Sequence, residues 1–332
     1  MTKVAIVGAS GYGGAELVRL LSTHPSVEIV AVTSGRSAGK LLREECPWLA
    51  TDLVLSSFDP ATAECDVAFL CQEAGFAMQH ARTLVERGIK VIDLSADFRL
   101  QDLGLFQKYY KMEHADSELL KEAAYGLPEL GDRCAIKKAR LVANPGCHVT
   151  ASLLGLMPLL ASVAKDAVPV VDSKTGVSGA GRSRKETAYL FSELDGGISA
   201  YAVAGHRHTP EIEMLAGLKV RFTPHLIPVP RGLVSTVHVP LTTPVDVLET
   251  LKARYAHEPM VQVLDTPPNS KAVSGTNAAH VWGTYDEHTG MAVVVTAIDN
   301  LGKGAAGQAI QNMNLMLGLP ETSGIPLSGL WP

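Results

Sequence analysis

The sequence lacks long apolar runs and carries few charged residues. Charged residues make up 19% and hydrophobic residues 46% of its 332 residues, a composition that is ordinary for a globular protein. The longest apolar runs fall far short of the roughly 20 residues that a membrane helix needs. No basic stretch followed by an apolar one opens the chain, so we expect no signal peptide. The length predicts about two domains with a sizeable core. The short apolar runs predict no membrane partner.

The sequence also lacks a long basic run and a cysteine pattern typical of disulfides or zinc. The formal net charge is -5, and nothing in the charge pattern indicates a nucleic-acid partner. The five cysteines are odd in number, and their spacings fit neither a CxxC pair nor a zinc knuckle. We therefore expect free thiols, a reducing cytoplasmic location and no bound metal.

The N-terminal region shows the pattern of a strand, a glycine-rich turn, a helix and a second strand. Residues 3–7 and 27–33 are strand-like, and residues 15–21 have helical periodicity. The turn between them has glycines at GxxGxxG spacing, which permits a tight turn, the approach of a pyrophosphate and its binding at a helix N-terminus. We predict a dinucleotide site here, with a merely structural turn as the alternative. The predicted cofactor residues are Gly8, Ser10, Gly11, Tyr12, Gly13 and Gly14.

The end of the second strand indicates which dinucleotide binds. An acidic residue there would bind the ribose hydroxyls of NAD, but this chain has Ser34 and Arg36 and no carboxylate. A hydroxyl and a guanidinium suit the 2′-phosphate of NADP(H), so we predict that cofactor. A solvated loop is the alternative.

Strands and helices continue to alternate through the first half of the chain. Strand-like segments at 66–71, 90–94 and 140–143 predict a doubly wound, Rossmann-type parallel sheet in an α/β fold. The pattern then changes to strands with few helices, which predicts a second α+β domain with an antiparallel or mixed sheet. We expect the last helix, 304–317, to return to the first domain. The predicted domains are 1–146 plus 300–332 for NADP binding, and 147–299 for catalysis and oligomerisation.

The segment Asn144-Pro145-Gly146-Cys147-His148 carries the strongest candidate nucleophile. Cys147 follows a Pro-Gly turn at the end of a predicted strand and opens an apolar, helical run from 149 to 163. A thiol at a helix N-terminus is stabilised as the nucleophilic thiolate. A small buried cysteine in a turn is the alternative.

Two further polar clusters are candidates for holding an anion. Arg99 follows Asp93 and Asp97 at the carboxyl end of a predicted strand, where it could hold a substrate phosphate or pair with Asp97. The loop 176–182 is rich in glycine, and its N–H groups with Arg182 could cradle an anionic ligand. A flexible connector is the other interpretation of that loop.

A third cluster places two histidines, an arginine and a glutamate between residues 204 and 212. The His206-x-His208 pattern is compatible with a metal, but no further ligand pair stands at a suitable spacing. A histidine base with neighbouring substrate ligands fits this composition better.

Six segments, at 8–14, 93–99, 144–147, 178–182, 206–211 and 299–308, follow one another along the chain. Together they resemble the N-acetyl-gamma-glutamyl-phosphate reductase family, and the resemblance extends over nearly the whole chain. That resemblance implies NADPH-dependent reductive dephosphorylation of N-acetyl-L-glutamyl 5-phosphate to N-acetyl-L-glutamate 5-semialdehyde, a step of arginine biosynthesis. Two positions depart from the commonest form: His148 replaces tyrosine, and Gly302 replaces a larger residue.

The resemblance also implies roles for individual residues. Cys147 would accept the acyl group as nucleophile through a thioester, and His206 would be the general acid/base. Asn300 would lie near the nicotinamide, and we also assign Ser178 and Gly179 to the cofactor. The predicted substrate-binding residues are Arg99, Arg182, Arg207, His208 and Glu211. We expect a homodimer or homotetramer that acts on a small acyl phosphate.

Other enzymes of the same build remain as alternatives. Aspartate-semialdehyde dehydrogenase uses the same cysteine–histidine logic, but its cysteine usually follows asparagine directly, whereas Pro145 and Gly146 precede Cys147 here. A reductase for an aminoadipyl phosphate differs by one methylene and a blocking group. A catalytically inactive dinucleotide sensor would be expected to lack the nucleophile or the base, and a cysteine–histidine hydrolase would need no nicotinamide.

Overall fold

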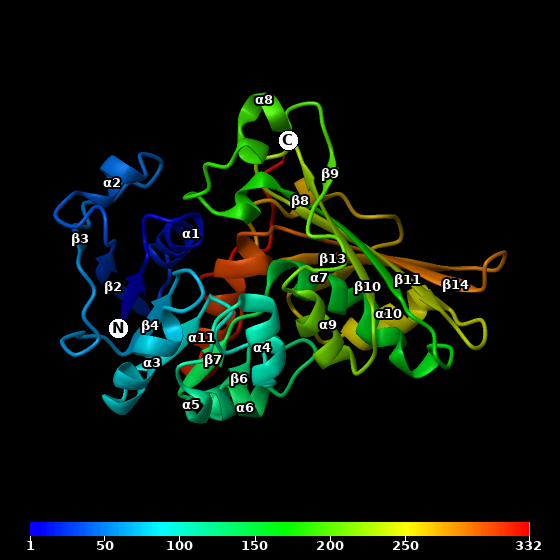
Figure 1. Ribbon diagram of the computed structural model, residues 1–332, viewed down its shortest axis with the longest axis horizontal. Helices are drawn as coiled ribbons and strands as arrows, with labels where there is room; N and C mark the ends of the chain where they lie inside the picture. The colour runs from blue at the N-terminus through cyan, green and yellow to red at the C-terminus, as the bar shows by residue number, and fades with distance from the viewer. Residues whose placement is uncertain (332) are drawn as a thin grey trace. The chain divides into compact units, whose positions relative to one another are not determined.

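The computed structural model describes residues 1–331 and divides into two compact units (Figure 1). The chain passes from the first unit to the second at Pro145 and Gly146, directly before Cys147. Unit 1 consists of residues 1–145, 181–183 and 305–325, and unit 2 of residues 146–180, 184–304 and those from 326 onward.

Unit 1 is built on a seven-stranded sheet in which every pair of neighbouring strands is parallel. Its strand order is β3-β2-β1-β4-β5-β7-β6. From β1 the chain builds the sheet outward on one side as far as β3 and then, from β4, on the other side, so the strand order reverses between β1 and β4. Short Val-, Ile- and Leu-rich strands that are buried on both faces are typical of such sheets. The predicted doubly wound fold is therefore confirmed. The strands are β1 (Thr2–Val7), β2 (Val27–Thr33), β3 (Leu55–Ser56), β4 (Val67–Leu70), β5 (Lys90–Asp93), β6 (Ala124–Tyr125) and β7 (Leu141–Ala143).

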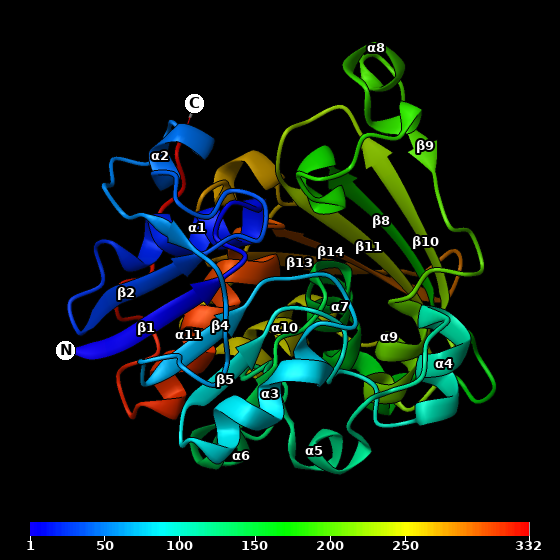
Figure 2. The same cartoon turned by 60° about the vertical axis from the view of Figure 1, so that its left-hand side comes forward.

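Helices cover both faces of this sheet (Figure 2). One layer packs into a core cluster with Phe98 and Phe106, and the other contains the last helix, which contacts β5. That helix belongs to unit 1. The first layer is α3 (Ala77–Glu86), α4 (Leu103–Tyr110) and α5 (Ser117–Glu122), and the second is α1 (Tyr12–Leu21), α6 (Arg133–Lys138) and α11 (Gly307–Met316).

Unit 2 contains a seven-stranded mixed sheet in the order β12-β13-β14-β11-β8-β10-β9. The pairs β8–β10 and β12–β13 are parallel, and the other neighbours are antiparallel. This agrees with the expected antiparallel or mixed sheet. The strands are β8 (Val170–Gly176), β9 (Ser199–Ala200), β10 (Arg221–Ile227), β11 (Leu233–Pro240), β12 (Val261–Val263), β13 (Ala279–Asp286) and β14 (Met291–Ile298).

One face of the unit 2 sheet is covered by helices and the other is partly exposed. Buried and half-buried residues alternate along β11, the pattern of a strand with one covered face. Gly155 of α7 permits close packing, because an added Cβ would lie 3.2 Å from the Val237 side chain. The helices are α7 (Cys147–Leu156), α9 (Thr209–Ala216) and α10 (Val247–Tyr255), with the short α8 (Phe191–Leu194) further out.

Several predicted boundaries differ from the structure. The helix predicted for 149–163 begins at Cys147 and ends at Leu156, where a 3₁₀ turn containing Pro158 follows. The segment between β2 and β4 also contains the short helix α2 (Leu42–Glu45), in addition to β3. The last helix begins with the π-helical turn Gly302–Ala306. Gly302 is required there, since an added Cβ would lie 1.9 Å from the Thr276 carbonyl oxygen.

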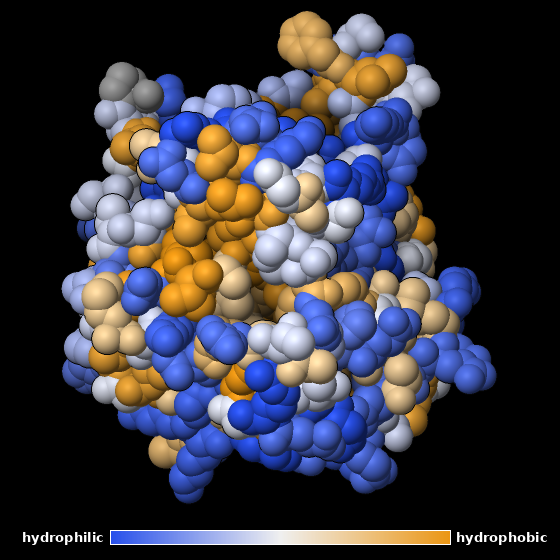
Figure 3. All heavy atoms as spheres, turned by 90° about the vertical axis from the view of Figure 1, so that its left-hand side faces the viewer, coloured by the Kyte–Doolittle hydropathy of each residue, from blue (hydrophilic) through white to orange (hydrophobic). Residues whose placement is uncertain are grey.

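The segment around α8 exposes large apolar side chains. Phe191 is 80% and Ile198 is 70% exposed. Apolar residues project from the surface at the upper right of Figure 3.

Among residues 1–331, no helix combines the length and the apolar character that crossing a membrane requires.

Candidate functional site

The glycine-rich turn of unit 1 lies between β1 and α1, at the point where the strand order reverses. Gly8 has φ +90°, and an added Cβ would lie 2.6 Å from the Cys71 carbonyl oxygen. An added Cβ at Gly14 would lie 2.3 Å from the Gly8 carbonyl oxygen. Only glycine fits at both positions, and the turn brings the N-terminus of α1 to the carboxyl edge of the sheet, where such folds bind ligands.

The N-terminus of α1 is suited to an anion. Its N-cap, Gly11, provides no side-chain cap, and its first turn contains no acidic residue. A Cβ at Gly13 would meet no atom within 4 Å. The first N–H groups of this helix and the positive end of its dipole are therefore available to a pyrophosphate. These residues fit a dinucleotide.

Hydroxyl and guanidinium groups surround this turn. The Ser10 and Ser34 hydroxyls are hydrogen-bonded at 3.0 Å, which joins the turn to the end of β2. Arg36 is exposed two residues further on. Arg182, which was predicted to bind substrate, donates to the carbonyl oxygens of Ser10 and Glu45 at 2.9 and 2.6 Å. The structure thus places Arg182 in unit 1, beside the predicted cofactor turn.

Arg99 and the neighbouring aspartates form a buried polar group at the end of β5. Arg99 donates from Nε to the Asn144 carbonyl oxygen at 2.7 Å and from its terminal nitrogen to the Leu94 carbonyl oxygen at 2.9 Å. Asp97 accepts from the backbone N–H groups of Gly75 and Met78. Burial, followed by the charge of Asp97, raises the pKa of Asp93 to about 7. Arg99 therefore braces the backbone just before the Pro145-Gly146-Cys147 turn.

Cys147 is the first residue of α7 in unit 2 and is partly exposed. Gly146 is the N-cap, and its N–H donates to Glu211 Oε1 at 3.1 Å. Glu211 is fully buried in α9, so a carboxylate from another helix fixes the turn before the thiol. Gly304 lies against the cysteine, because an added Cβ there would be 2.7 Å from Cys147 Cβ.

The two histidines of the predicted catalytic segment pack together beside this turn. The ring centroids of His206 and His208 are 4.8 Å apart. An added Cβ at Gly146 would lie 2.4 Å from His208 Nε2, so the His208 ring lies directly against the residue before Cys147. His208 and Glu211 thus both contact Gly146, and the structure brings these predicted site residues together.

His206 has a defined hydrogen-bonding state. Its Nδ1 accepts from the His208 backbone N–H at 3.0 Å, which leaves the proton of the neutral ring on Nε2. Burial, with a smaller effect of the Arg207 charge, lowers the pKa of His206 to about 4. His206 is therefore a neutral ring whose Nε2–H is able to donate. Arg207 itself is exposed.

His148 packs against the rings of His206 and His208. It is hydrogen-bonded to Ser173 and Tyr201, two residues that no sequence pattern indicates. His148 Nδ1 and Ser173 Oγ are 2.8 Å apart, and His148 Nε2 and Tyr201 Oη are 2.9 Å apart. Neither partner stands in a recognisable motif, and they lie 25 and 53 residues from His148 along the chain. Only the replacement of tyrosine by His148 signals an unusual environment.

Asn300 joins two segments of unit 2 through its side-chain amide. It donates from Nδ2 to the Ser178 hydroxyl at 2.9 Å and accepts at Oδ1 from the Gly232 N–H at 2.7 Å. An added Cβ at Gly179 would be 3.8 Å from Asn300 Nδ2. The loop at 177–180 is therefore fixed to Asn300, and three predicted cofactor residues lie together. In residues 1–331, no group of three or more His, Cys, Asp or Glu side chains is arranged to hold a metal ion.

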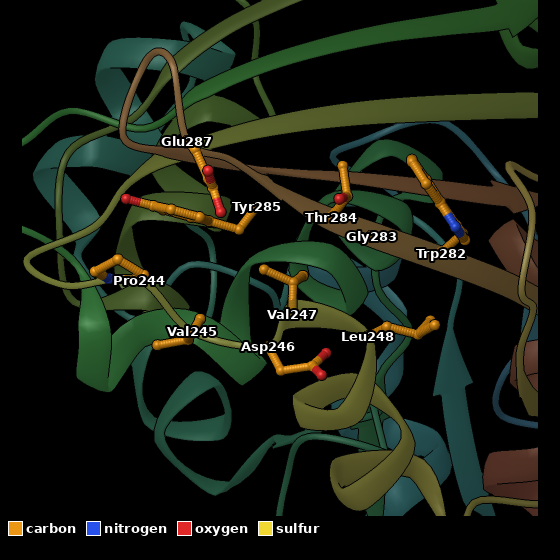
Figure 4. A pocket seen from close by; sticks show the side chains of 10 residues that line it. All are labelled: Pro244, Val245, Asp246, Val247, Leu248, Trp282, Gly283, Thr284, Tyr285 and Glu287. Carbon is orange, nitrogen blue, oxygen red and sulfur yellow. The ribbon is translucent and has the colours of Figure 1, made fainter.

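A cavity of about 470 Å³ in unit 2 lies away from all of these residues. It is bordered by the start of α10 and by β13 (Figure 4). Asp246 and Tyr285 line it, but none of the predicted site residues does. The candidate site is therefore identified by its side-chain chemistry and not by this cavity.

Two family models match the two parts of the chain. Residues 3–139 match the model described as "Semialdehyde dehydrogenase, NAD binding domain", and residues 147–300 match "Semialdehyde dehydrogenase, dimerisation domain". The second match begins at Cys147 and ends at Asn300. The chain thus has the nicotinamide-cofactor domain of an oxidoreductase family together with that family's dimerisation domain.

Solved structures share the fold. Aspartate semialdehyde dehydrogenase II of Vibrio cholerae, complexed with ASA, is similar with a TM-score of 0.74 and 20% identity, covering 96% of this chain and 98% of that one. Aspartate semialdehyde dehydrogenase with NADP from Candida albicans has a TM-score of 0.72 and 18% identity, with coverage of 96% and 98%. At these identities the likeness establishes the two-domain α/β fold alone.

Relatives of known name are much more similar in sequence. The N-acetyl-gamma-glutamyl-phosphate reductase of Thiobacillus denitrificans is 46% identical over 344 aligned positions, covering 100% of both chains. That of Laribacter hongkongensis is also 46% identical, with the same full coverage. The chain therefore belongs to the N-acetyl-gamma-glutamyl-phosphate reductase family, within the semialdehyde dehydrogenases.

Proposed function

We propose that this enzyme reduces N-acetyl-L-glutamyl 5-phosphate to N-acetyl-L-glutamate 5-semialdehyde with NADPH and releases phosphate, a step of arginine biosynthesis. The names of relatives that are 46% identical over their full length support this reaction. The structural observation that carries it is the position of Cys147 as the first residue of α7, with His208 and Glu211 packed on the preceding Gly146.

In the proposed reaction the Cys147 thiolate attacks the acyl carbon. Phosphate leaves with the electrons of the bond that breaks, and the acyl group remains on sulfur as a thioester. The first N–H groups and the dipole at the start of α7 stabilise both the thiolate and the oxyanion that forms at each addition. A thiol suits this substrate because it holds the acyl group without losing it to water.

His206 is proposed as the general acid/base of the reaction. Its neutral ring carries a proton on Nε2, as the hydrogen bond to Nδ1 requires. That proton is available to the oxygen of the acyl carbonyl as negative charge develops there. Glu211 and His208 fix the turn that carries the thiol, and we propose that His208 also contacts the substrate.

NADP(H) is proposed to bind unit 1 through the glycine-rich turn, with Ser34 and Arg36 at the 2′-phosphate. When bound, the dinucleotide would supply the hydride that reduces the acyl carbon. The carbon–sulfur bond then breaks, its electrons return to Cys147 as the thiolate, and the aldehyde is released. The open space at Gly13 and the Ser10–Ser34 hydrogen bond support this assignment. On unit 2 we propose that Ser178, Gly179 and Asn300 also contact the cofactor, supported by their mutual contacts.

Cationic side chains are proposed to hold the phosphate and the carboxylate of the substrate. Arg207 is exposed next to His206 and is the first candidate. Arg182 and Arg99 remain candidates, although both donate to backbone carbonyl oxygens. These contacts brace the backbone, and substrate binding by either arginine would be an additional role.

The dimerisation domain indicates an oligomer, and we propose a homodimer or homotetramer. The uncovered face of the unit 2 sheet is the proposed contact surface. Val234 and His238 of β11, Trp282 of β13 and Val293 and Val295 of β14 are half-buried on that face in the single chain. We also propose a cytoplasmic location, where the five cysteine thiols, none of them in a disulfide, would stay reduced.

The direct test follows the NADPH absorbance band with purified enzyme. Supplied with NADP, phosphate and N-acetyl-glutamate semialdehyde, the enzyme should generate NADPH in the reverse reaction. Aspartate semialdehyde in the same assay serves as the control substrate and should give a much lower kcat/KM. Faster turnover of aspartate semialdehyde would contradict the proposed substrate. NADPH formation that needs no phosphate would contradict the acyl-phosphate chemistry.

A further inference from the structure

A histidine that directly follows the proposed nucleophile lies at the centre of a buried ring cluster. His148 is only 2% exposed. Its ring centroid is 5.6 Å from that of His206, 5.8 Å from that of His208 and 5.4 Å from that of Phe222. The His206 and Phe222 contacts are edge-on, with interplanar angles of 77° and 67°. His148 therefore borders both histidines of the catalytic segment.

Both ring nitrogens of His148 have hydrogen-bond partners. Nδ1 is 2.8 Å from Ser173 Oγ on β8, and Nε2 is 2.9 Å from Tyr201 Oη in the segment that leads to His206. Ser173 is fully buried, so one end of this chain of hydrogen bonds is fixed in the sheet. The three groups therefore form a continuous path from the sheet to Tyr201, five residues before His206.

The His148 ring is neutral, which limits it to one donated and one accepted hydrogen bond. Burial, followed by the charge of His206, lowers the pKa of His148 to about 3. When Ser173 donates to Nδ1, Nε2 donates to Tyr201, and the phenol retains its own proton for a third group. The opposite tautomer would direct the Tyr201 proton back to His148.

Cys147 directly precedes His148 as the first residue of α7, and the Tyr201 ring centroid lies 5.5 Å from that of His206. Burial raises the pKa of the Tyr201 phenol, and the charge of Cys147 raises it further. The phenol therefore stays protonated at neutral pH. A protonated phenol beside a thiolate stabilises the thiolate, since the charged form gains a donor or a favourable dipole.

We propose that His148 is a positioning residue: it holds the Tyr201 hydroxyl toward Cys147 and keeps His206 in place beside them. The sheet residue Ser173 anchors it, and the tautomer with Nε2–H leaves the Tyr201 proton available to a group other than His148. The kinetic part of this inference rests on the proposed function. Its effect on the Cys147 thiol does not, because that effect exists without substrate.

The test compares His148→Phe, Tyr201→Phe and the double variant. His148→Phe keeps a planar ring and removes both hydrogen bonds. His24→Phe is the matched control, since His24 is also buried and has both nitrogens hydrogen-bonded, but lies in unit 1. Two quantities are measured: kcat with the KM for NADPH, and the pH midpoint of Cys147 alkylation by iodoacetamide.

Each single variant should lose on the order of 10-fold in kcat with little change in the KM for NADPH, because a misplaced group costs turnover more than binding. The double variant should lose no more than the worse single one, since both break the same path. The alkylation midpoint should move to higher pH in all three and stay unchanged in His24→Phe. Additive losses in the double variant, or an unmoved midpoint, would overturn the proposal.

Two further measurements keep the inference independent of folding and of the substrate. If His148→Phe does not fold, Ser173→Ala breaks the same path at its other end and should raise the alkylation midpoint in the same direction. If the wild-type enzyme does not turn over the proposed substrate while the midpoint still shifts, the proposed function fails and the positioning role stands. An unmoved midpoint in an enzyme that turns over the proposed substrate overturns the positioning role and leaves the proposed function standing.

Discussion

The His208 ring occupies the space in which a side chain at position 146 would stand. An added Cβ at Gly146 would lie 2.4 Å from Nε2 and 2.7 Å from Cε1 of that ring. Because Gly146 is the N-cap of the helix that begins with Cys147, this contact couples the catalytic segment of α9 to the position of the thiol. The requirement for glycine before the cysteine therefore concerns packing against histidine, and not backbone conformation, since Gly146 has φ -70°.

Gly146→Ala should therefore impair catalysis more than stability. The new methyl group would displace His208 or the start of α7, and we expect a loss of kcat on the order of 100-fold. The KM for NADPH should change little. Gly197→Ala is the control, because its Cβ would meet only the Leu194 carbonyl oxygen at an ordinary 3.7 Å. Steady-state kinetics of both variants checks this, and near-wild-type kcat in Gly146→Ala would contradict the packing argument.

Gly14→Ala should abolish dinucleotide binding. An added Cβ would lie 2.3 Å from the Gly8 carbonyl oxygen and 2.7 Å from Ala9 Cα, so the turn before α1 must open. Overpacking of this kind costs about 1–3 kcal/mol of folding free energy. The measurement is NADPH binding by fluorescence together with a urea unfolding curve. The control Gly13→Ala, where a Cβ meets no atom within 4 Å, should unfold like the wild type.

Arg36→Ala should discriminate between the two nicotinamide cofactors. If Arg36 binds the 2′-phosphate, the variant should raise the KM for NADPH on the order of 10-fold or more and leave the KM for NADH nearly unchanged, because only NADPH carries that group. The exposed Arg43 is the control, since it already pairs with Asp52. An equal loss with both cofactors would show that Arg36 does not recognise the phosphate.

Folding stability should fall as the solution becomes acidic. The pKa of His206 is lowered to about 4 and that of His148 to about 3, both first by burial. The unfolded chain therefore binds more protons below about pH 6.5, and stability decreases as pH falls from there through the folded-state values. Between pH 6.5 and 5 each histidine contributes a loss of roughly 2 kcal/mol as an upper figure. Urea unfolding at the two pH values measures this, and His148→Phe should show the smaller decrease.

The local elements are predictable because their signals are local. The alternation around residues 2–33 predicts β1, α1 and β2, and the Pro-Gly turn predicts a helix that begins near Cys147. The pattern places the end of that helix too late, because Leu159 and neighbouring apolar residues continue it through a 3₁₀ turn. The helix α9 is not predicted, since polar residues dominate the segment from 204 to 211.

The assembly of the site is less predictable, because it depends on contacts between distant residues. The types of Cys147, His206 and Glu211 indicate their chemistry, but nothing in the sequence shows that Glu211 caps the turn at Gly146, 65 residues away. The same holds for Ser173 and Tyr201, which are brought together by their hydrogen bonds to His148, 25 and 53 residues away along the chain. Arg99 illustrates the reverse case, where a charged residue at a ligand-binding edge donates to backbone carbonyl oxygens.

The central claim is that Cys147 carries the acyl group, and Cys147→Ser tests it most directly. A serine hydroxyl is not ionised at neutral pH, so the variant should lose nearly all turnover of N-acetyl-glutamyl phosphate while it still binds NADPH. The exposed Cys134 provides the control, and Cys134→Ser should keep wild-type activity. The measurement is the rate of NADPH consumption by Cys147→Ser. A rate near zero is predicted, and a rate close to that of the wild type would contradict the assignment of Cys147 as the nucleophile.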